Sequence, residues 1–254
     1  MPEAVQSLSE QFQPIPVRLD PSLKSTIAFA IRRFADLQLG TIWTFLEPRL
    51  SKLRGSLLDV GCGEMPYRTC LHPDLSYTGI DVAEADAFAM RKSDAVVQFD
   101  GVSIPFGDAS FETILCTEVL EHAAAPEALI AEIERVLKPG GTLLATVPFS
   151  ARVHYASYDF NRFTKFALSQ MFASFSDVRI EERGNDVAVI ANKLIVVSLR
   201  MVRPSRWSLL HWPLLLLVLP LALIFLLVAH LTIALDLGSK DDPLGYSIVA
   251  VKRD

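Results

Sequence analysis

Five short apolar runs follow one another through the middle of the chain. They are SLLDVGCG, YTGIDV, AVVQFD, FETILCTEVLEH and GTLLATVPF, beginning at Ser56 and ending at Phe149. Continuous apolar runs of this length are typical of strands that are buried on both faces of a parallel sheet. Such strands need helices on both faces of the sheet, so the order of the runs already restricts the fold to a few α/β architectures.

Two other parts of the chain have helical periodicity, with apolar residues at three- and four-residue steps. The first is Leu23–Lys52, where Gly40 interrupts the pattern and predicts a break between two helices. The second is PEALIAEIERVLKPGG, between the fourth and fifth runs, and we expect Gly140 and Gly141 to end that helix. Strands that alternate with helices predict a doubly wound α/β sheet. The early helices then form an N-terminal helical cap.

The sequence LLDVGCGEMPY ends the first predicted strand in a glycine turn. Gly61 and Gly63 allow a tight turn and let a ligand lie against the backbone. Asp81 ends the second strand, where a carboxylate can accept both hydroxyls of a ribose. Pro66 stands where a dinucleotide fingerprint has its third glycine, and Asp59 is placed to bind a positively charged group. A nucleoside that carries cationic charge and no phosphate therefore fits better than NAD.

Four blocks in this order resemble the class I S-adenosylmethionine-dependent methyltransferases, in their type 11-like group. The blocks are LLDVGCGEMPY, YTGIDV, FETILCTEVLEH and the run from PEALIAEIERVLKPGG to VP, and together they cover about Leu53 to Pro148. Glu112 stands where the family usually has aspartate. The resemblance implies a Rossmann-like sheet of seven strands whose last strand is antiparallel, and S-adenosyl-L-methionine as the cofactor.

The resemblance also implies roles for single residues. The loop around the methionine and ribose part of the cofactor would be formed by Asp59, Gly61 and Gly63, and Asp81 would hold the ribose hydroxyls. The remaining cofactor-binding residues would be Asp100 and Gly101 beside the adenine, and Thr117 and Glu118 near the methyl group.

A further block, PFSARVHYASYDFNRFTKFALSQMF, follows the fifth strand. It resembles a segment of bacterial methyltransferases found with cell-surface polysaccharide or lipid biosynthesis. If the acceptor is a hydroxyl, a base must take its proton, and His154 is the candidate, with Asp159 orienting it and Arg162 contacting an anion. The alternative is that His154 is a surface loop residue and that Asp159 and Arg162 form a structural ion pair. We interpret His122, in EVLEH, as structural or cofactor-lining.

Charge and residue usage exclude several classes of function. The formal net charge is −5, so we expect no nucleic-acid partner. The three cysteines, Cys62, Cys70 and Cys116, have no metal-ligand spacing and are expected to be free thiols. The five histidines form no HxxxH or HxH pair, so we expect no metal site built by the protein. The N-terminus does not resemble a secretory signal.

A long apolar run precedes the last predicted strand. VRIEERG and GYSIVAVKR are the sixth and seventh strand candidates, and LLHWPLLLLVLPLALIFLLVAHLTIALDLG lies between them. The run is long enough to cross a hydrocarbon core of ~30 Å. Because neighbouring strands must lie on one side of any membrane, we expect a helical hairpin with residues 187–202 as its first arm and RPSRW as its loop. Three alternatives stay open: a hairpin that dips into or lies on the cytoplasmic leaflet, a hairpin that spans twice, and an insertion buried against protein or in a dimer interface.

These patterns predict three segments: a helical cap at 1–52, an S-adenosylmethionine-binding methyltransferase domain at 53–184 and 245–254, and an apolar hairpin insertion at 185–244. The insertion has basic residues at Lys193, Arg200, Arg203 and Arg206, which suit an anionic cytoplasmic membrane surface. We therefore expect a methyltransferase at the cytoplasmic side of a membrane, acting on a lipid-linked or membrane-derived acceptor. The alternatives are a quinone or other apolar small molecule as the acceptor, and a non-catalytic membrane scaffold. A homodimer formed through the insertion is also compatible with the pattern.

Overall fold

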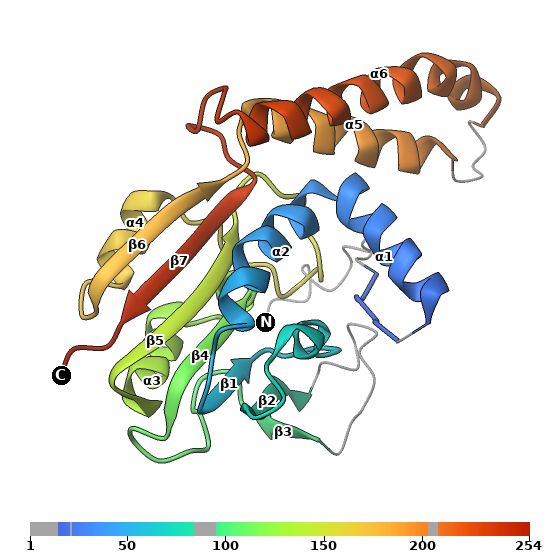
Figure 1. Ribbon diagram of the computed structural model, residues 1–254. Coiled ribbons are helices and arrows are strands. Elements are labelled where there is room, and N and C mark those ends of the chain that lie inside the picture. The colour runs from blue at the N-terminus through green and yellow to red at the C-terminus, as the bar shows by residue number, and fades with distance from the viewer. Residues whose placement is uncertain (1–14, 21, 84–94, 203–207) are drawn as a thin grey trace.

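The computed structural model describes residues 15–20, 22–83, 95–202 and 208–254. Seven strands form one sheet in the order β3-β2-β1-β4-β5-β7-β6 (Figure 1). β7 is antiparallel to both β5 and β6, and the pairs among β1 to β5 are parallel, which confirms the predicted sheet. The strands are β1 Ser56–Val60, β2 Ser76–Val82, β3 Val96–Phe99, β4 Phe111–Thr117, β5 Leu137–Pro148, β6 Ser176–Arg183 and β7 Gly245–Val251.

Helices cover both faces of this sheet. Period-2 alternation along each strand divides the apolar side chains between two cores. Leu57 and its neighbours on one face pack against the helix α2, whereas Leu58 and its neighbours on the other face pack with α3 and α4. The helices are α1 Leu23–Ala35, α2 Leu37–Leu50, α3 Pro126–Val136, α4 Lys165–Met171, α5 Asp186–Val202 and α6 Ser208–Ala234, with short 3₁₀ turns η2 Pro66–Cys70 and η4 Leu120–His122.

Two glycine-based predictions of helix ends were wrong. The cap helices separate at Asp36, whose side chain accepts a hydrogen bond from the Leu39 backbone N–H at 3.2 Å. Gly40 lies inside α2, where a Cβ atom would be 2.6 Å from the Arg33 carbonyl oxygen, so this glycine permits close approach of α1. Likewise, α3 ends at Val136, and the glycines that follow belong to β5 beside a bulge in its pairing with β4.

The apolar insertion is a helical hairpin, as predicted. Helices α5 and α6 pack side by side beyond the end of the sheet at which β6 ends (Figure 1). Their outer ends are joined by RPSRW, residues 203–207, which lie outside the described residues. The two inner ends are tied together, because the Asp186 N–H donates to the Ser239 carbonyl at 3.0 Å and the Asn185 amide donates to the Leu237 carbonyl at 2.7 Å. The chain therefore leaves and re-enters the sheet at one place.

Most of α6 faces away from the protein. Within the described residues, His211–Ala234 is the one helical stretch that is long and apolar enough to cross a membrane by length and composition. Only 17% of its most apolar part is buried. Protein therefore covers little of this helix in a single chain. The most exposed large side chains of the helix include Leu216, Leu217, Ile224, Leu227 and Leu231.

Candidate active site

The glycine turn after β1 and the end of β2 meet at the carboxyl edge of the sheet. Gly61 and Gly63 both have positive φ, at 68° and 50°. The Gly63 N–H donates to one Asp81 carboxylate oxygen at 2.8 Å, and the Val82 N–H donates to the other at 2.8 Å. Each oxygen keeps a free lone-pair direction, so the carboxylate can still accept two ribose hydroxyls. Burial raises the pKa of Asp81.

Asp59 points to the α2 face of the sheet and is 1% exposed. One carboxylate oxygen accepts the Tyr77 hydroxyl at 2.7 Å, and the other has no hydrogen-bond partner among the described residues. Burial raises the pKa of Asp59 to about 7, the Tyr77 bond lowers it, and nearby Asp81 raises it further. A buried oxygen without a donor favours a ligand group that is cationic or that donates a hydrogen bond.

The turn also needs glycine for a steric reason. A Cβ atom at Gly61 would lie 2.4 Å from a methyl group of Val119, so no larger residue fits without movement. Asp100 and Gly101 follow β3 at the same edge of the sheet. The Asp100 carboxylate accepts the N–H groups of Val102 and Ser103 at 2.9 and 2.6 Å, and these bonds lower its pKa. Asp100 therefore shapes its own turn, which brings Gly101 to the edge.

Thr117 and Glu118 lie at the end of β4. Glu118 has φ of 52°, a strained region for a residue other than glycine, and its N–H donates to the Thr146 carbonyl at 2.9 Å. Its carboxylate pairs with Arg183 at 2.8 Å. Arg183, which was not predicted from the sequence, is 4% exposed and joins several elements around Glu118. Its other hydrogen-bond acceptors are the carbonyls of Gln38, Val147 and Tyr246, and the side chains of Gln38 and Thr41.

The loop after β5 brings together the predicted catalytic residues His154 and Asp159. Asp159 accepts the His154 backbone N–H at 3.0 Å, and its side chain lies 3.4 Å from the His154 Nδ1 atom. Asp159 also forms a two-point ion pair with Arg162, at 2.5 and 2.7 Å. The carboxylate therefore has the structural partner that the alternative interpretation expected, and it also touches the imidazole that it was expected to orient.

Two further side chains lie against His154. The ring of His122 is 4.8 Å from the His154 ring, and the His122 Nε2 atom is 3.6 Å from a Glu121 oxygen. Glu121 is fully buried, and the burial together with the nearby Glu118 charge raises its pKa well above the usual range. Burial and then the charge of His154 lower the pKa of His122 to about 4. The sequence showed Glu121 only as one acid in EVLEH, and the histidine spacing did not anticipate the cluster.

A cavity of about 380 Å³ opens beside Glu118 and His154, and we call it the acceptor pocket. One wall is the inserted helix α5, through Ile195, Val196 and Leu199. The rest of the lining comes from the α1–α2 junction and the loop after β5, namely Ile15, Arg32, Ala35, Asp36, Gln38, Pro148, Ala151 and Arg152, with Asn192 and Lys193 also contributed by α5.

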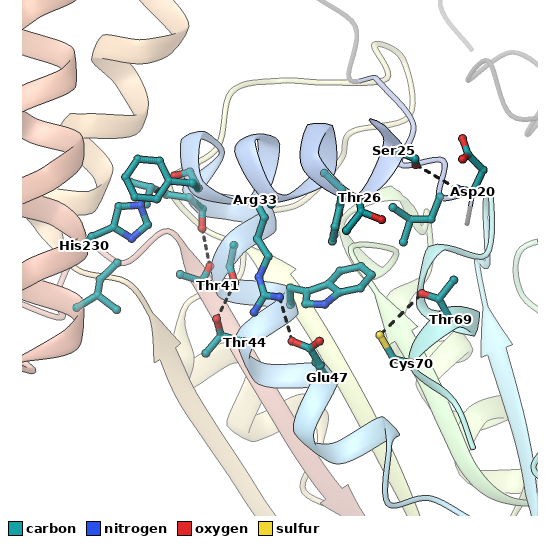
Figure 2. Close-up of a pocket in the computed structure, with 18 residues that line it drawn as sticks. Asp20, Ser25, Thr26, Arg33, Thr41, Thr44, Glu47, Thr69, Cys70 and His230 are labelled. Carbon is teal, nitrogen blue, oxygen red and sulfur yellow. Dashed lines mark hydrogen bonds and ion pairs between the residues drawn. The ribbon is translucent and has the colours of Figure 1, made fainter. Parts of the chain in front are cut away.

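A larger cavity, of about 810 Å³, lies between α1, α2, η2 and α6 (Figure 2). Arg33 and Glu47 form a 3.0 Å ion pair across it, and His230 of α6 stacks on Phe34 of α1. None of the predicted site residues lines this cavity. This cavity therefore lies outside the candidate active site.

The protein-family profile described as "Methyltransferase domain" matches residues 58–145, which include the glycine turn, Asp81 and Glu118. The match covers residues 58–145 of the 254-residue chain and supports a methyltransferase domain of the class I S-adenosylmethionine-dependent kind. It is 32% identical over 111 residues to a tRNA U34 carboxymethyltransferase of Nautilia profundicola, a match that covers 40% of this chain and 37% of that protein. It is 33% identical over 103 residues to a ubiquinone biosynthesis O-methyltransferase of Paracidovorax citrulli, covering 36% of this chain and 43% of that protein. The chain thus spans less than half the length of the curated relatives that it matches.

Solved structures share the fold at low identity. The [4+2]-cyclase SpnF aligns with a TM-score of 0.53 and 21% identity, covering 85% of this chain and 82% of that one. A phosphoethanolamine N-methyltransferase 2 of Haemonchus contortus, in complex with phosphomonomethylethanolamine and S-adenosylhomocysteine, aligns with a TM-score of 0.52 and 16% identity, covering 90% and 57%. Since one neighbour is named as a cyclase and the other as a methyltransferase, the shared fold does not by itself determine the reaction.

S-adenosyl-L-methionine is the cofactor of this family, and the residues present fit it. The unpartnered oxygen of Asp59 suits the positive charge that this cofactor has and that a dinucleotide lacks there. Asp81 keeps two acceptor directions for a ribose, and the turn at Gly61 leaves no side chain between ligand and backbone. The assignment of individual residues to parts of the cofactor stays a prediction.

Proposed function

We propose that this protein is an S-adenosylmethionine-dependent methyltransferase that acts at the cytoplasmic face of a membrane on a lipid-linked or membrane-derived acceptor. The observation that carries the proposal is that the hairpin contributes both to the acceptor pocket and to an exposed apolar surface. Helix α5 forms a wall of the acceptor pocket next to Glu118, and helix α6, packed on α5, exposes an apolar surface. An acceptor held in a lipid layer would thus reach the pocket along the same element that contacts the layer.

The reaction requires alignment more than chemical assistance. An acceptor oxygen attacks the methyl carbon, the carbon–sulfur bond breaks with its electron pair going to sulfur, and S-adenosylhomocysteine leaves. In this proposal the cofactor is held by Asp59, Gly61, Gly63, Asp81, Asp100, Gly101, Thr117 and Glu118. His154, which lines the acceptor pocket, takes the proton of the acceptor hydroxyl, and Asp159 is its positioning residue.

Membrane attachment would use the exposed leucines and the bases of the hairpin. Each leucine that is fully buried in an apolar phase contributes roughly 1.5–3 kcal/mol, and each base near an anionic surface about 1 kcal/mol. Leu216 and Leu217 are 77% and 72% exposed, and Lys193 and Arg200 lie on the surface of α5. The low burial of α6 favours the two membrane alternatives, and a dimer through the insertion, over an insertion covered by its own chain.

An apolar small molecule such as a quinone is the second candidate acceptor. Ile195, Val196 and Leu199 make the α5 wall of the pocket apolar, and one relative is a ubiquinone biosynthesis O-methyltransferase. A non-catalytic scaffold is less well supported, because the turn geometry at Gly63 and Asp81 suits a bound nucleoside.

Transfer of labelled methyl from S-adenosylmethionine into cell extract tests the proposal. We expect the label in the lipid phase, and mild acid should release it as a water-soluble sugar if the acceptor is a lipid-linked glycan. Label that stays in the lipid phase after acid identifies a quinone-like acceptor. Label confined to water-soluble molecules contradicts a membrane acceptor, and no transfer beyond that of an Asp81→Ala control supports the scaffold.

Flotation with anionic vesicles tests the attachment separately. The wild-type protein should float with the vesicles, and the Leu216→Glu/Leu217→Glu variant should remain at the bottom. Phe166→Glu is the matched control, because Phe166 is 83% exposed but lies on α4, outside the hairpin. A wild-type protein that stays unbound, or that elutes as a dimer with no vesicle binding, contradicts membrane attachment.

A further inference from the structure

Three side chains of the candidate site offer ligand atoms to one small space. Glu121 and His122 come from the η4 turn after β4, and His154 comes from the loop after β5. One ligand atom from each residue lies within 4.8 Å of the other two. Glu121 is 0% exposed, and neither of its carboxylate oxygens has a hydrogen-bond partner among the described residues.

The hydrogen bond of the His122 ring shows which of its nitrogen atoms has a lone pair directed at the Glu121 carboxylate. Its Nδ1 atom lies 2.8 Å from the Tyr158 carbonyl oxygen. A carbonyl can only accept, so Nδ1 must hold the proton and Nε2 of the neutral ring must have a lone pair. That Nε2 atom is buried without a hydrogen-bond partner among the described residues and is 3.6 Å from a Glu121 oxygen.

His154 repeats this arrangement. Its Nδ1 atom lies 3.2 Å from the Arg152 carbonyl oxygen and 3.4 Å from an Asp159 carboxylate oxygen, both of which only accept. The Nε2 atom of the neutral ring therefore also has a lone pair, and it is 3.9 Å from the same Glu121 oxygen. Two imidazole lone pairs and a carboxylate therefore converge, and no described residue donates a hydrogen bond to either Glu121 oxygen.

The nearby donors do not resolve this arrangement. The Arg162 guanidinium is held by two contacts to Asp159. A protonated Glu121 could donate to one imidazole, but 3.6 Å is too long for that hydrogen bond. A buried carboxylate without a hydrogen-bond donor costs several kcal/mol unless positive charge compensates it, and the nearby Arg162 charge is shared with Asp159.

We propose that Glu121, His122 and His154 bind a divalent transition-metal ion. Two imidazoles and one carboxylate form a ligand set that suits Zn²⁺, Fe²⁺, Co²⁺ or Mn²⁺ and leaves coordination positions open. Metal-to-ligand distances of about 2.0–2.2 Å place neighbouring ligands roughly 3.0–3.5 Å apart. The two histidine-to-Glu121 distances, 3.6 and 3.9 Å, therefore need to shorten by a few tenths of an ångström, whereas a pair at the 4.8 Å limit of the cluster needs to shorten by about 1 Å or slightly more. The Nδ1 contacts to Tyr158, Arg152 and Asp159 are the outer hydrogen bonds that metal-binding histidines usually make.

The ion would act on the acceptor in place of direct proton transfer to His154, and this role rests on the proposed function. His154 belongs both to the cluster and to the wall of the acceptor pocket, so the ion would lie beside the acceptor. Bound there, it would supply positive charge that makes an acceptor hydroxyl lose its proton to water more easily.

Titration of chelator-treated protein with Co²⁺ tests the site without cofactor or acceptor. We expect one tight equivalent with visible absorption bands and a rise in the unfolding temperature. Glu121→Gln and His154→Gln should each weaken binding at least tenfold. His72→Gln is the matched control, because His72 lies after η2 and pairs with Asp74 at the surface, and its binding should equal wild type.

Failure of wild-type protein to bind, or equal binding by Glu121→Gln, overturns the metal site. Without metal, Glu121→Gln should be at least as stable as wild type, because it removes a buried charge, and this separates loss of a ligand from misfolding. If the protein still transfers methyl groups after a chelator has removed the metal, the proposed function stands and the role of the ion in it is rejected. Cofactor binding measured in parallel identifies failure of the proposed function itself.

Discussion

The proposed ribose-binding part of the site draws its polar groups from residues 59–81, on two neighbouring strands, whereas the acceptor end draws its groups from segments between Ile15 and Leu199. At the nucleoside end, backbone N–H groups within the turn and strand hold the Asp81 carboxylate. At the acceptor end, a buried Arg183 holds Glu118 and joins α2, β5, β6 and β7. Local geometry therefore builds one end, and long-range packing builds the other.

The largest expected effect on this contrast comes from replacing Arg183, the buried cation of the acceptor end. Arg183→Met should lower the free energy of unfolding by about 3–5 kcal/mol, because it leaves Glu118 and several carbonyl oxygens without their donor. Arg179→Met, at an exposed position of the same strand, should change stability by less than about 0.5 kcal/mol. Denaturant unfolding of the two variants makes the comparison. Equal effects would mean that Arg183 does not organise the acceptor end.

Removing the nucleoside carboxylate should leave the acceptor end intact. Asp81→Ala loses the acceptor of two proposed ribose bonds, each worth about 1.5–3 kcal/mol, so S-adenosylmethionine should bind roughly 100-fold more weakly or worse. Asp74→Ala removes an exposed acid just before β2 and should bind as wild type does. Calorimetry measures both, and unchanged affinity in Asp81→Ala would place the ribose elsewhere.

Filling the acceptor pocket changes the acceptor end of the site and should leave cofactor binding intact. Val196→Trp places an indole in the pocket and should slow methyl transfer into lipid extract about tenfold, with cofactor affinity unchanged. Val197→Trp is the matched control, because Val197 is the next residue of α5, is 37% exposed and does not line the pocket. If both variants transfer methyl equally, acceptors do not use this cavity.

The smallest expected effect is the release of a single proton from Asp59 when the cofactor binds. Burial raises the pKa of Asp59 to about 7. In the free protein the folded state binds more protons than the unfolded state from about pH 4 to 7, so stability falls as pH rises through that range. A cationic cofactor beside Asp59 favours the carboxylate, so binding near pH 6 should release close to one proton, and binding near pH 9 almost none. Calorimetry in buffers of different ionisation enthalpy measures this release. Release by Asp59→Asn at the same level would exclude Asp59 as the source.

The contrast also explains which features could be predicted from the sequence. Gly61, Gly63 and Asp81 follow from spacing along two strands, and the doubly wound sheet with an antiparallel last strand follows from the apolar runs and the family resemblance. The break at Gly40 was predicted wrongly because the carbonyl of Arg33 that fills its empty side is a tertiary contact. Glu121 and Arg183 resemble ordinary charged residues in the sequence, and only their burial sets them apart. The α5 wall of the acceptor pocket depends on where the hairpin packs, which no local pattern contains.

The position of β7 between β5 and β6 has a kinetic consequence. β6 reaches the sheet through β7, so its place remains open until residues 184–244 and β7 have left the ribosome. At about 5–20 residues per second, synthesis of that stretch takes on the order of several seconds. During that interval the apolar hairpin has been synthesised while the sheet that anchors it is incomplete. If the proposed membrane attachment is correct, the hairpin can meet a lipid surface before the sheet closes.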